Sequence, residues 1–203
     1  MHIVFVRFVC SILMLLAPVA VSASTWKINP DHSSIQFQVR YMTVVNVKGA
    51  FDKFQGTVEL DEKNLAKSTV NVSIDSTSIN TGVEKRDEHL RTDDFFDCSK
   101  YPTITFVSKK VNPAGKGKLK VIGHLTMLGK TKEVILEVDG PTPAIKDPWG
   151  NSRRGATAKG KIDRKDFGLT WNKVLDTGGI MVGDQVNIIM EVELVKEPDD
   201  KAS

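Results

Sequence analysis

Apolar and polar side chains alternate along most of this chain. Runs with a period of two occur at residues 35–41, 70–75, 104–106, 118–125, 133–138 and 186–194. Such alternation is typical of β-strands that turn one face to a core and the other to water. The shorter segments 47–51 and 57–60 have the same character. The pattern therefore predicts a protein of about eight strands.

The predicted strands are separated by turn-forming sequences rather than by long helices. Segments containing Gly, Pro, Asn or Asp lie at residues 112–115, 128–130 and 139–141. These residue types suit tight turns between neighbouring strands. We therefore expect an antiparallel all-β fold, either a sandwich or a closed barrel, and closure would remove exposed sheet edges.

One segment departs from the strand pattern. Residues 81–84 read Thr-Gly-Val-Glu, the form of a capping box in which the threonine hydroxyl and the glutamate carboxylate bind unpaired amides at a helix start. A short helix is predicted at residues 83–92. Asp87 and Arg91 are spaced as a favourable helical ion pair. A second helical turn is expected at residues 163–167.

The first 23 residues have the composition of a secretory signal. Arg7 precedes an apolar run over residues 8–20, and Val-Ser-Ala at 21–23 provides a small-residue cleavage site. The run is interrupted by Pro18 and is shorter than the roughly 20 residues of a membrane span. We expect cleavage after Ala23, export, a single β-domain over residues 24–196 and a polar tail at 197–203.

Charge and cysteine content narrow the possible partners. The net charge is +3, and basic and acidic residues are interspersed, so the basic stripe of a nucleic-acid-binding protein is absent from the sequence. After signal cleavage Cys98 is the remaining cysteine, which excludes an internal disulfide. A secreted domain without disulfides depends on a large apolar core. No role is assigned to Cys98.

The sequence contains no recognisable catalytic or metal-binding motif. Its histidines after the signal, His32, His89 and His124, are isolated, so we expect neither a metal nor a cofactor. The densest polar segment is 86–91, which would place Arg86 and His89 on one helix face. They could hold an anionic or hydroxylated head group at a pocket rim, but charged runs more often face water. The adjacent arginines at 153–154 similarly favour a solvated bend.

The apolar strand faces leave one question open. A closed sheet of about eight strands either fills its interior with side chains or leaves room for one ligand. The inward positions are mostly of medium size, and Gly49, Gly56 and Gly123 occupy apolar-phase positions. These features favour an elongated apolar cavity, whereas a filled core remains the alternative.

Several sequence blocks resemble the YceI-like family. They are residues 26–28 (WKI), 31–33 (DHS), 47–51 (VKGAF), 86–91 (RDEHLR), 95–97 (FFD), 101–106 (YPTITF), 123–132 (GHLTMLGKTK) and 166–171 (DFGLTW). The resemblance extends over essentially the whole chain after the signal. It implies a lipocalin-like antiparallel barrel, exported to the bacterial periplasm, that encloses a polyisoprenoid or other long-chain lipid and often forms a homodimer.

The resemblance also implies which residues would contact the ligand. The expected cavity wall consists of Phe37, Val39, Val72, Phe106, Leu136, Phe167 and Trp171. Chemistry alone suggests Arg86, His89 and Arg91 for one end of the cavity. The resulting hypothesis is a non-enzymatic periplasmic protein that sequesters or carries a lipid and contacts the membrane transiently.

Two alternatives remain open. The first is an enzyme acting on a lipid head group, with His89 as the acid–base group and Arg86 or Arg91 holding negative charge. The second is a structural or stress-response barrel that binds no ligand. An internal void would distinguish the second alternative from the carrier. Lysines 116, 118 and 120 could approach anionic lipid, although exposed strand lysines more often prevent edge pairing.

Overall fold

The computed structural model describes residues 23–176 and 178–198. The expected signal segment, up to Ser22, and the end of the polar tail lie outside the described residues, so neither expectation is tested. Within the described part of the chain, no helix has the length and apolar character needed to cross a bilayer.

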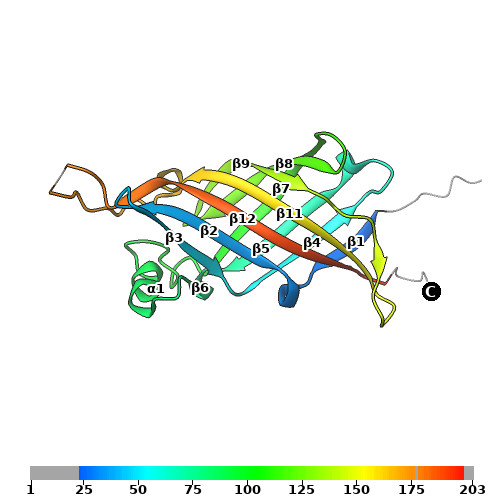
Figure 1. Cartoon of the computed structure of the whole chain (residues 1–203), viewed down its shortest axis with the longest axis horizontal. Coiled ribbons are helices and arrows are strands. Elements are labelled where there is room, and N and C mark those ends of the chain that lie inside the picture. The colour runs from blue at the N-terminus through cyan, green and yellow to red at the C-terminus, as the bar shows by residue number, and fades with distance from the viewer. Residues whose placement is uncertain (1–22, 177, 199–203) are drawn as a thin grey trace, which may run out of the picture.

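The described strands form a closed antiparallel barrel (Figure 1). Within residues 23–176 and 178–198, the ring consists of β1 (Ser24–Ile28), β4 (Phe54–Leu60), β5 (Thr69–Asp75), β7 (Thr103–Pro113), β8 (Lys118–Met127), β9 (Lys130–Asp139), β11 (Ser152–Asp163) and β12 (Val182–Lys196). Pairing of β11 with β12 along residues 153–163 closes it. This confirms the predicted all-β barrel and excludes the sandwich.

The barrel opens out at one end because its first strand is broken. The 3-10 turn η1 (Pro30–His32) separates β1 from β2 (Ser34–Tyr41), and both pair with β12. Strand β2 continues to β3 (Val45–Phe51), which ends on the two-residue β6 (Ile79–Asn80). A further short strand, β10 (Ile145–Lys146), pairs antiparallel with the start of β11.

Helix α1 (Glu84–Arg91) lies beside β6 at this opening, on the left in Figure 1, and confirms the predicted helix. Its predicted capping box is wrong, because Val83 occupies the N-cap and makes no side-chain hydrogen bond there. Instead, the Thr81 amide and hydroxyl both donate to Asp87 Oδ1. The Asp87 carboxylate is buried in this role, and Arg91 pairs with Glu84 at 3.5 Å rather than with Asp87.

Several 3-10 turns complete the described chain. They are η2 (Leu65–Lys67), η3 (Ser76–Ser78) and η4 (Arg164–Phe167). Turn η4 confirms the predicted second helical turn. It ends at Gly168, whose φ of 91° is in the left-handed region that glycine adopts without a Cβ clash.

The interior glycines do not themselves leave cavity space, contrary to the expectation from the sequence. A Cβ on Gly49 would lie 2.3 Å from the Phe37 ring, and one on Gly123 would lie 2.4 Å from the Phe106 ring. On Gly56 it would lie 2.6 Å from Ile28. The space before each glycine is therefore filled by a neighbouring side chain. These glycines let large side chains lie close to the wall, and they are not themselves voids.

Candidate binding cavity

The barrel contains a cavity of about 270 Å³. Inward side chains from every strand of the ring line it, and Leu90, Phe95 and Phe96 cover it from α1 and the following turn. Its lining is apolar apart from Gln36, Ser68 and Arg164. Such a cavity suits an apolar group and offers few hydrogen-bonding partners.

Opposite walls of the cavity differ in how well they are covered. On β7, β8 and β9 the inward side chains, such as Ile104 and Val121, are buried, except for the half-buried Val138. On β2 and β12 the inward side chains Phe37, Val186 and Ile188 line the cavity but are only half-buried. Apolar surface therefore remains uncovered on the β2–β12 wall, and a bound apolar chain would cover it.

Trp26 lies behind the cavity lining, in a second core cluster. This side chain is 1% exposed and packs with Ile28, Leu60 and Leu194. The Arg154 guanidinium lies 5.0 Å from the centre of the Trp26 ring, a distance at which the aromatic face attracts a cation. The expectation that Arg154 belongs to a solvated bend is wrong, because it is largely buried in β11.

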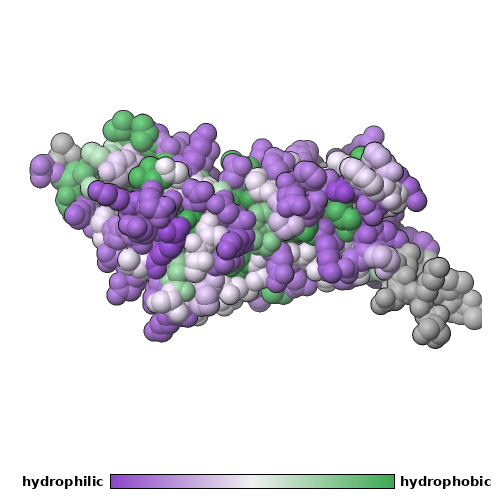
Figure 2. Space-filling view, turned by 90° about the horizontal axis from the view of Figure 1, so that it is seen from below, coloured by the Kyte–Doolittle hydropathy of each residue, from purple (hydrophilic) through white to green (hydrophobic). Residues whose placement is uncertain are grey.

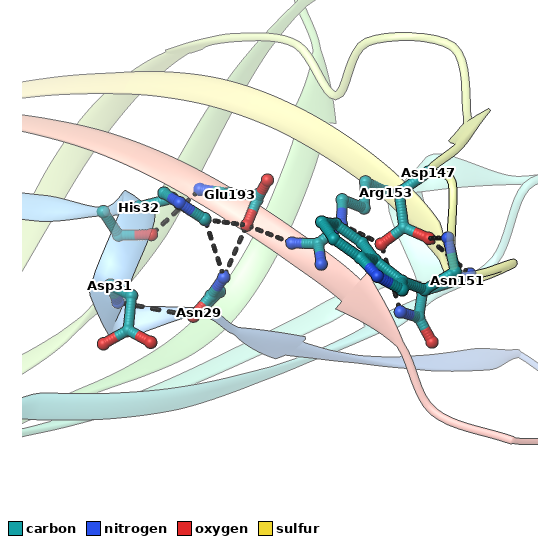
Figure 3. A network of polar contacts seen from close by, with 9 residues as sticks. Asn29, Asp31, His32, Asp147, Asn151, Arg153 and Glu193 are labelled. Atoms are coloured by element: carbon teal, nitrogen blue, oxygen red, sulfur yellow. Dashed lines mark hydrogen bonds and ion pairs between the residues drawn. The ribbon is translucent and has the colours of Figure 1, made fainter.

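The neighbouring Arg153 belongs to a polar network on the outside of the barrel (Figure 3). Its guanidinium donates to Asp147 and to Glu193, each at 2.7 Å. Glu193 also accepts from Asn29 at 2.6 Å, and Nδ1 of His32 lies 3.1 Å from it. The network fastens η1 and the β10–β11 turn to β12. Arg153 is therefore also not in a solvated bend.

The two carboxylates of this network are acidic. Burial would raise the pKa of Asp147, but hydrogen bonds from Asn151 and Arg153 and from two backbone amides outweigh it and bring the pKa to about 2. Burial likewise opposes ionisation of Glu193, yet hydrogen bonds from Asn29 and His32 and the charge of Arg153 lower its pKa. Both groups therefore stabilise the fold in their ionised form.

Five of the predicted wall residues line the cavity: Phe37, Val39, Val72, Phe106 and Leu136. The other two, Phe167 and Trp171, are not among the residues that line it. Phe167 is buried in the main core cluster, and the Trp171 ring lies 5.1 Å from the rings of His89, which it meets edge-on, and Phe95. Contact of the five lining residues with a ligand remains a prediction.

The predicted end residues Arg86, His89 and Arg91 do not line the cavity. Arg86 donates to the Thr81 hydroxyl at 2.7 Å and to its carbonyl at 3.0 Å. Arg91 donates to the carbonyls of Thr77 and Ile79 at 2.9 and 3.0 Å. Arg86 and Arg91 therefore fasten α1 to the preceding chain at residues 77–81.

His89 is held on the outer side of the helix. Its Nε2 lies 2.8 Å from Asp94 Oδ2, and its ring meets Phe95 edge-on at 5.0 Å. It does not converge with Arg86 and Arg91 on a common point, so the arrangement gives no support to the enzymatic alternative. In the described part of the chain, no three His, Cys, Asp or Glu side chains gather as a metal site.

Cys98 is buried, and its burial raises the thiol pKa. Little thiolate forms near neutral pH in such surroundings, so a nucleophilic role has no support. Its role stays unassigned.

Arg164, a buried cation beside the cavity, is a residue that the sequence did not predict. Its guanidinium donates to the carbonyls of Leu169, Trp171 at 3.0 Å and Gly183 at 2.9 Å. Burial lowers its pKa, and Asp184, 3.4 Å away, opposes that shift. Arg164 thereby joins η4 to the loop that precedes β12. Its hydrogen-bond partners are backbone carbonyls and the carboxylate of Asp184, so no local sequence motif predicts its position.

Three known proteins show what this chain is similar to. A UPF0312 protein of Vibrio cholerae is 38% identical over 154 residues, which cover 75% of this chain and 81% of the relative. The crystal structure of Burkholderia cenocepacia BcnA superposes with a TM-score of 0.70 at 27% identity, covering 82% of this chain and 98% of BcnA.

A structure from Saccharophagus degradans, described as a polyisoprenoid binding domain implicated in plant cell wall breakdown, has a TM-score of 0.61. It covers 86% of this chain and 99% of that domain at 16% identity, which shows a shared fold. A sequence model of the YceI-like domain matches residues 26–194. Since that match takes in the whole barrel from Trp26 to Leu194, the chain belongs to the YceI-like family.

Proposed function

We propose that this protein binds the apolar tail of a polyisoprenoid or similar long-chain lipid inside its barrel, as a carrier or store rather than an enzyme. The observation that carries the proposal is the apolar cavity, with uncovered side chains on the β2–β12 wall. The related fold of a domain described as polyisoprenoid binding supports the same ligand class.

Burial of the tail supplies the binding free energy. Each methylene moved from water into an apolar site contributes about 0.8 kcal/mol, so an isoprene unit supplies a few kcal/mol before the chain's lost freedom is subtracted. Affinity should therefore rise with tail length until the tail outgrows the cavity. At about 270 Å³ the cavity is near the lower end of ligand sites, which start at roughly 300 Å³.

The proposal also concerns where and with what the protein acts. Its N-terminal apolar segment and small-residue cleavage site support export, and we propose the periplasm as its location. A carrier there would exchange its lipid with a membrane during a transient contact. Formation of a homodimer is an expectation from the family resemblance.

Organic extraction of the purified protein followed by mass spectrometry tests the ligand directly. We expect a long-chain lipid to co-purify, and an emptied protein to take up prenyl alcohols with affinity that rises with chain length. Recovery of buffer components alone, together with no uptake of prenyl chains, would refute the proposal and leave the ligand-free barrel.

A pair of substitutions on one strand sharpens this test. Ile188 points into the cavity and its neighbour Asn187 is exposed on the outer face. Ile188→Trp should fill the cavity and reduce prenyl uptake at least about tenfold, whereas Asn187→Trp should leave uptake unchanged. Equal uptake by both variants would show that the lipid binds elsewhere.

A further inference from the structure

Two loops expose apolar side chains at the end of the barrel that carries α1. Val44 is 71% exposed in the β2–β3 turn, and Val174 is 79% exposed in the loop before β12. Met42 and Ile180 in these loops, and Val45 at the start of β3, are also exposed. Scattered single apolar residues on a surface are ordinary, but five on two adjoining loops are a distinct feature. We call these five residues the apolar tip.

The two loops are joined by backbone hydrogen bonds. The Met42 amide donates to the Met181 carbonyl at 2.7 Å, and Tyr41 pairs with Val182. Within the second loop, Val174 forms an antiparallel bridge with Ile180. The loops project together beyond the barrel at the left of Figure 1, and Figure 2 shows apolar side chains gathered at the same end. The apolar tip is therefore one protrusion with its own internal support.

The apolar tip adjoins the cavity. Val39 and Val182 line the cavity and lie on the same strands as the tip, just inside Met42 and Ile180. At the opposite end Trp26 is almost completely buried behind the lining residues Ile28, Leu60 and Leu194. A lipid that left the cavity near α1 would meet the apolar tip first.

Charge around the apolar tip favours a negatively charged surface. Arg40 and Lys173 flank it and are exposed, and within residues 40–45 and 173–181 Asp176 is the one acidic residue. Cations beside a small apolar insertion are the arrangement that holds peripheral proteins on anionic bilayers.

We propose that the apolar tip inserts into the interface of an anionic lipid bilayer and brings the adjoining end of the cavity to the membrane. This inference rests on the proposed carrier function, because insertion there would let a tail pass between bilayer and barrel without crossing water. A second copy of the chain is a poorer occupant. Stable protein interfaces use roughly 20–30 residues a side, whereas the tip offers five apolar side chains on a convex protrusion.

Vesicle flotation tests the proposal. The purified protein should float with phosphatidylcholine vesicles that contain phosphatidylglycerol, and much less with phosphatidylcholine alone or at high salt. The double variant Val44→Ser/Val174→Ser should lower partitioning into anionic vesicles by about tenfold or more. Lys173→Gln should lower it by a smaller factor. These side chains are exposed, and circular dichroism will verify that the variants fold.

The matched control removes two other exposed β-branched apolar side chains, a valine and an isoleucine. Val107 on β7 and Ile135 on β9 are 48% and 52% exposed on the outside of the barrel. Val107→Ser/Ile135→Ser should float like the unmodified protein. No flotation of the unmodified protein, an equal loss in the control, or a change from dimer to monomer in the tip variant would each overturn the inference.

The same variants separate this inference from the carrier function. Val44→Ser/Val174→Ser should still take up a prenyl alcohol added from solution, because the cavity is unchanged. A protein that carries lipid but ignores vesicles contradicts the membrane contact alone. A protein that floats but neither contains nor takes up lipid contradicts the carrier function.

Discussion

At one end of the barrel, the Trp26 indole is sealed beneath the Arg154 guanidinium, whose other contacts include Glu62 at 2.6 Å. At the other end, the last residues of β3 pair with the two-residue β6, and valines in two loops are exposed to solvent. The comparison shows how one barrel can combine a tightly packed end with an end at which its apolar interior is accessible. The Trp26 end concentrates burial and paired charge, whereas the α1 end leaves apolar surface uncovered where the proposed ligand would enter.

The largest effect on stability should follow from removing the Trp26 side chain. Trp26→Ala removes a fully buried indole and should lower the free energy of unfolding by about 3–5 kcal/mol. Denaturant unfolding followed by circular dichroism measures this loss. Trp149→Ala is the matched control, because Trp149 is 81% exposed, and it should change stability by about 0.5 kcal/mol or less. Equal losses of stability in the two variants would contradict the structural role of Trp26 at this end of the barrel.

A smaller loss should come from crowding the well-covered wall. A Cβ on Gly123 of β8 would lie 2.4 Å from the Phe106 ring and 2.6 Å from the Val107 carbonyl oxygen. Gly123→Ala should therefore cost about 1–3 kcal/mol in unfolding experiments. At Gly155 of β11 the nearest atom is 3.8 Å away, so Gly155→Ala should be tolerated. If the two variants unfold alike, the wall is looser than the distances indicate.

Acid should loosen the network that fastens η1 to β12. The pKa of Asp147 is about 2 in the fold against an ordinary 3.8, so the unfolded chain takes up the proton first. Stability is therefore complete above about pH 4 and falls as the pH drops toward about 2. Asp147→Asn should flatten this acid limb in unfolding curves. The control Asp31→Asn, at an exposed carboxylate, should leave the limb unchanged. An unchanged acid limb in Asp147→Asn would contradict the role of this carboxylate.

The sequence predicts which side chains face the interior better than it predicts how they fill it. Alternation in residues 186–194 correctly separates Val186 and Ile188, which line the cavity, from the exposed Asn187. The alternating pattern predicts which face of the sheet a side chain occupies. It does not predict how far that side chain extends across the barrel interior. Phe37 was therefore placed correctly in the wall, whereas its ring lying over Gly49 was not foreseen.

Charged residues were predicted less well because their partners are far away in the sequence. Arg153 and Arg154 read locally as a solvated bend, yet Glu193 and Glu62 hold them from other elements. Arg86 and Arg91 read as ligand groups, yet backbone carbonyls of the preceding chain accept their hydrogen bonds. A helical face can be inferred from spacing, but its tertiary partners cannot.

The smallest effect is expected at His89, where it distinguishes a structural contact from catalysis. His89 joins α1 to Asp94 and to the rings of Phe95 and Trp171 on the outside of the helix. His89→Ala should lower stability by about 1 kcal/mol or less, since the histidine and Asp94 are substantially exposed. Prenyl uptake should remain within about twofold, because this ring does not line the cavity. A head-group reaction that His89→Ala abolished, with uptake intact, would instead show that the α1 end is a catalytic site, and access would no longer be its main purpose.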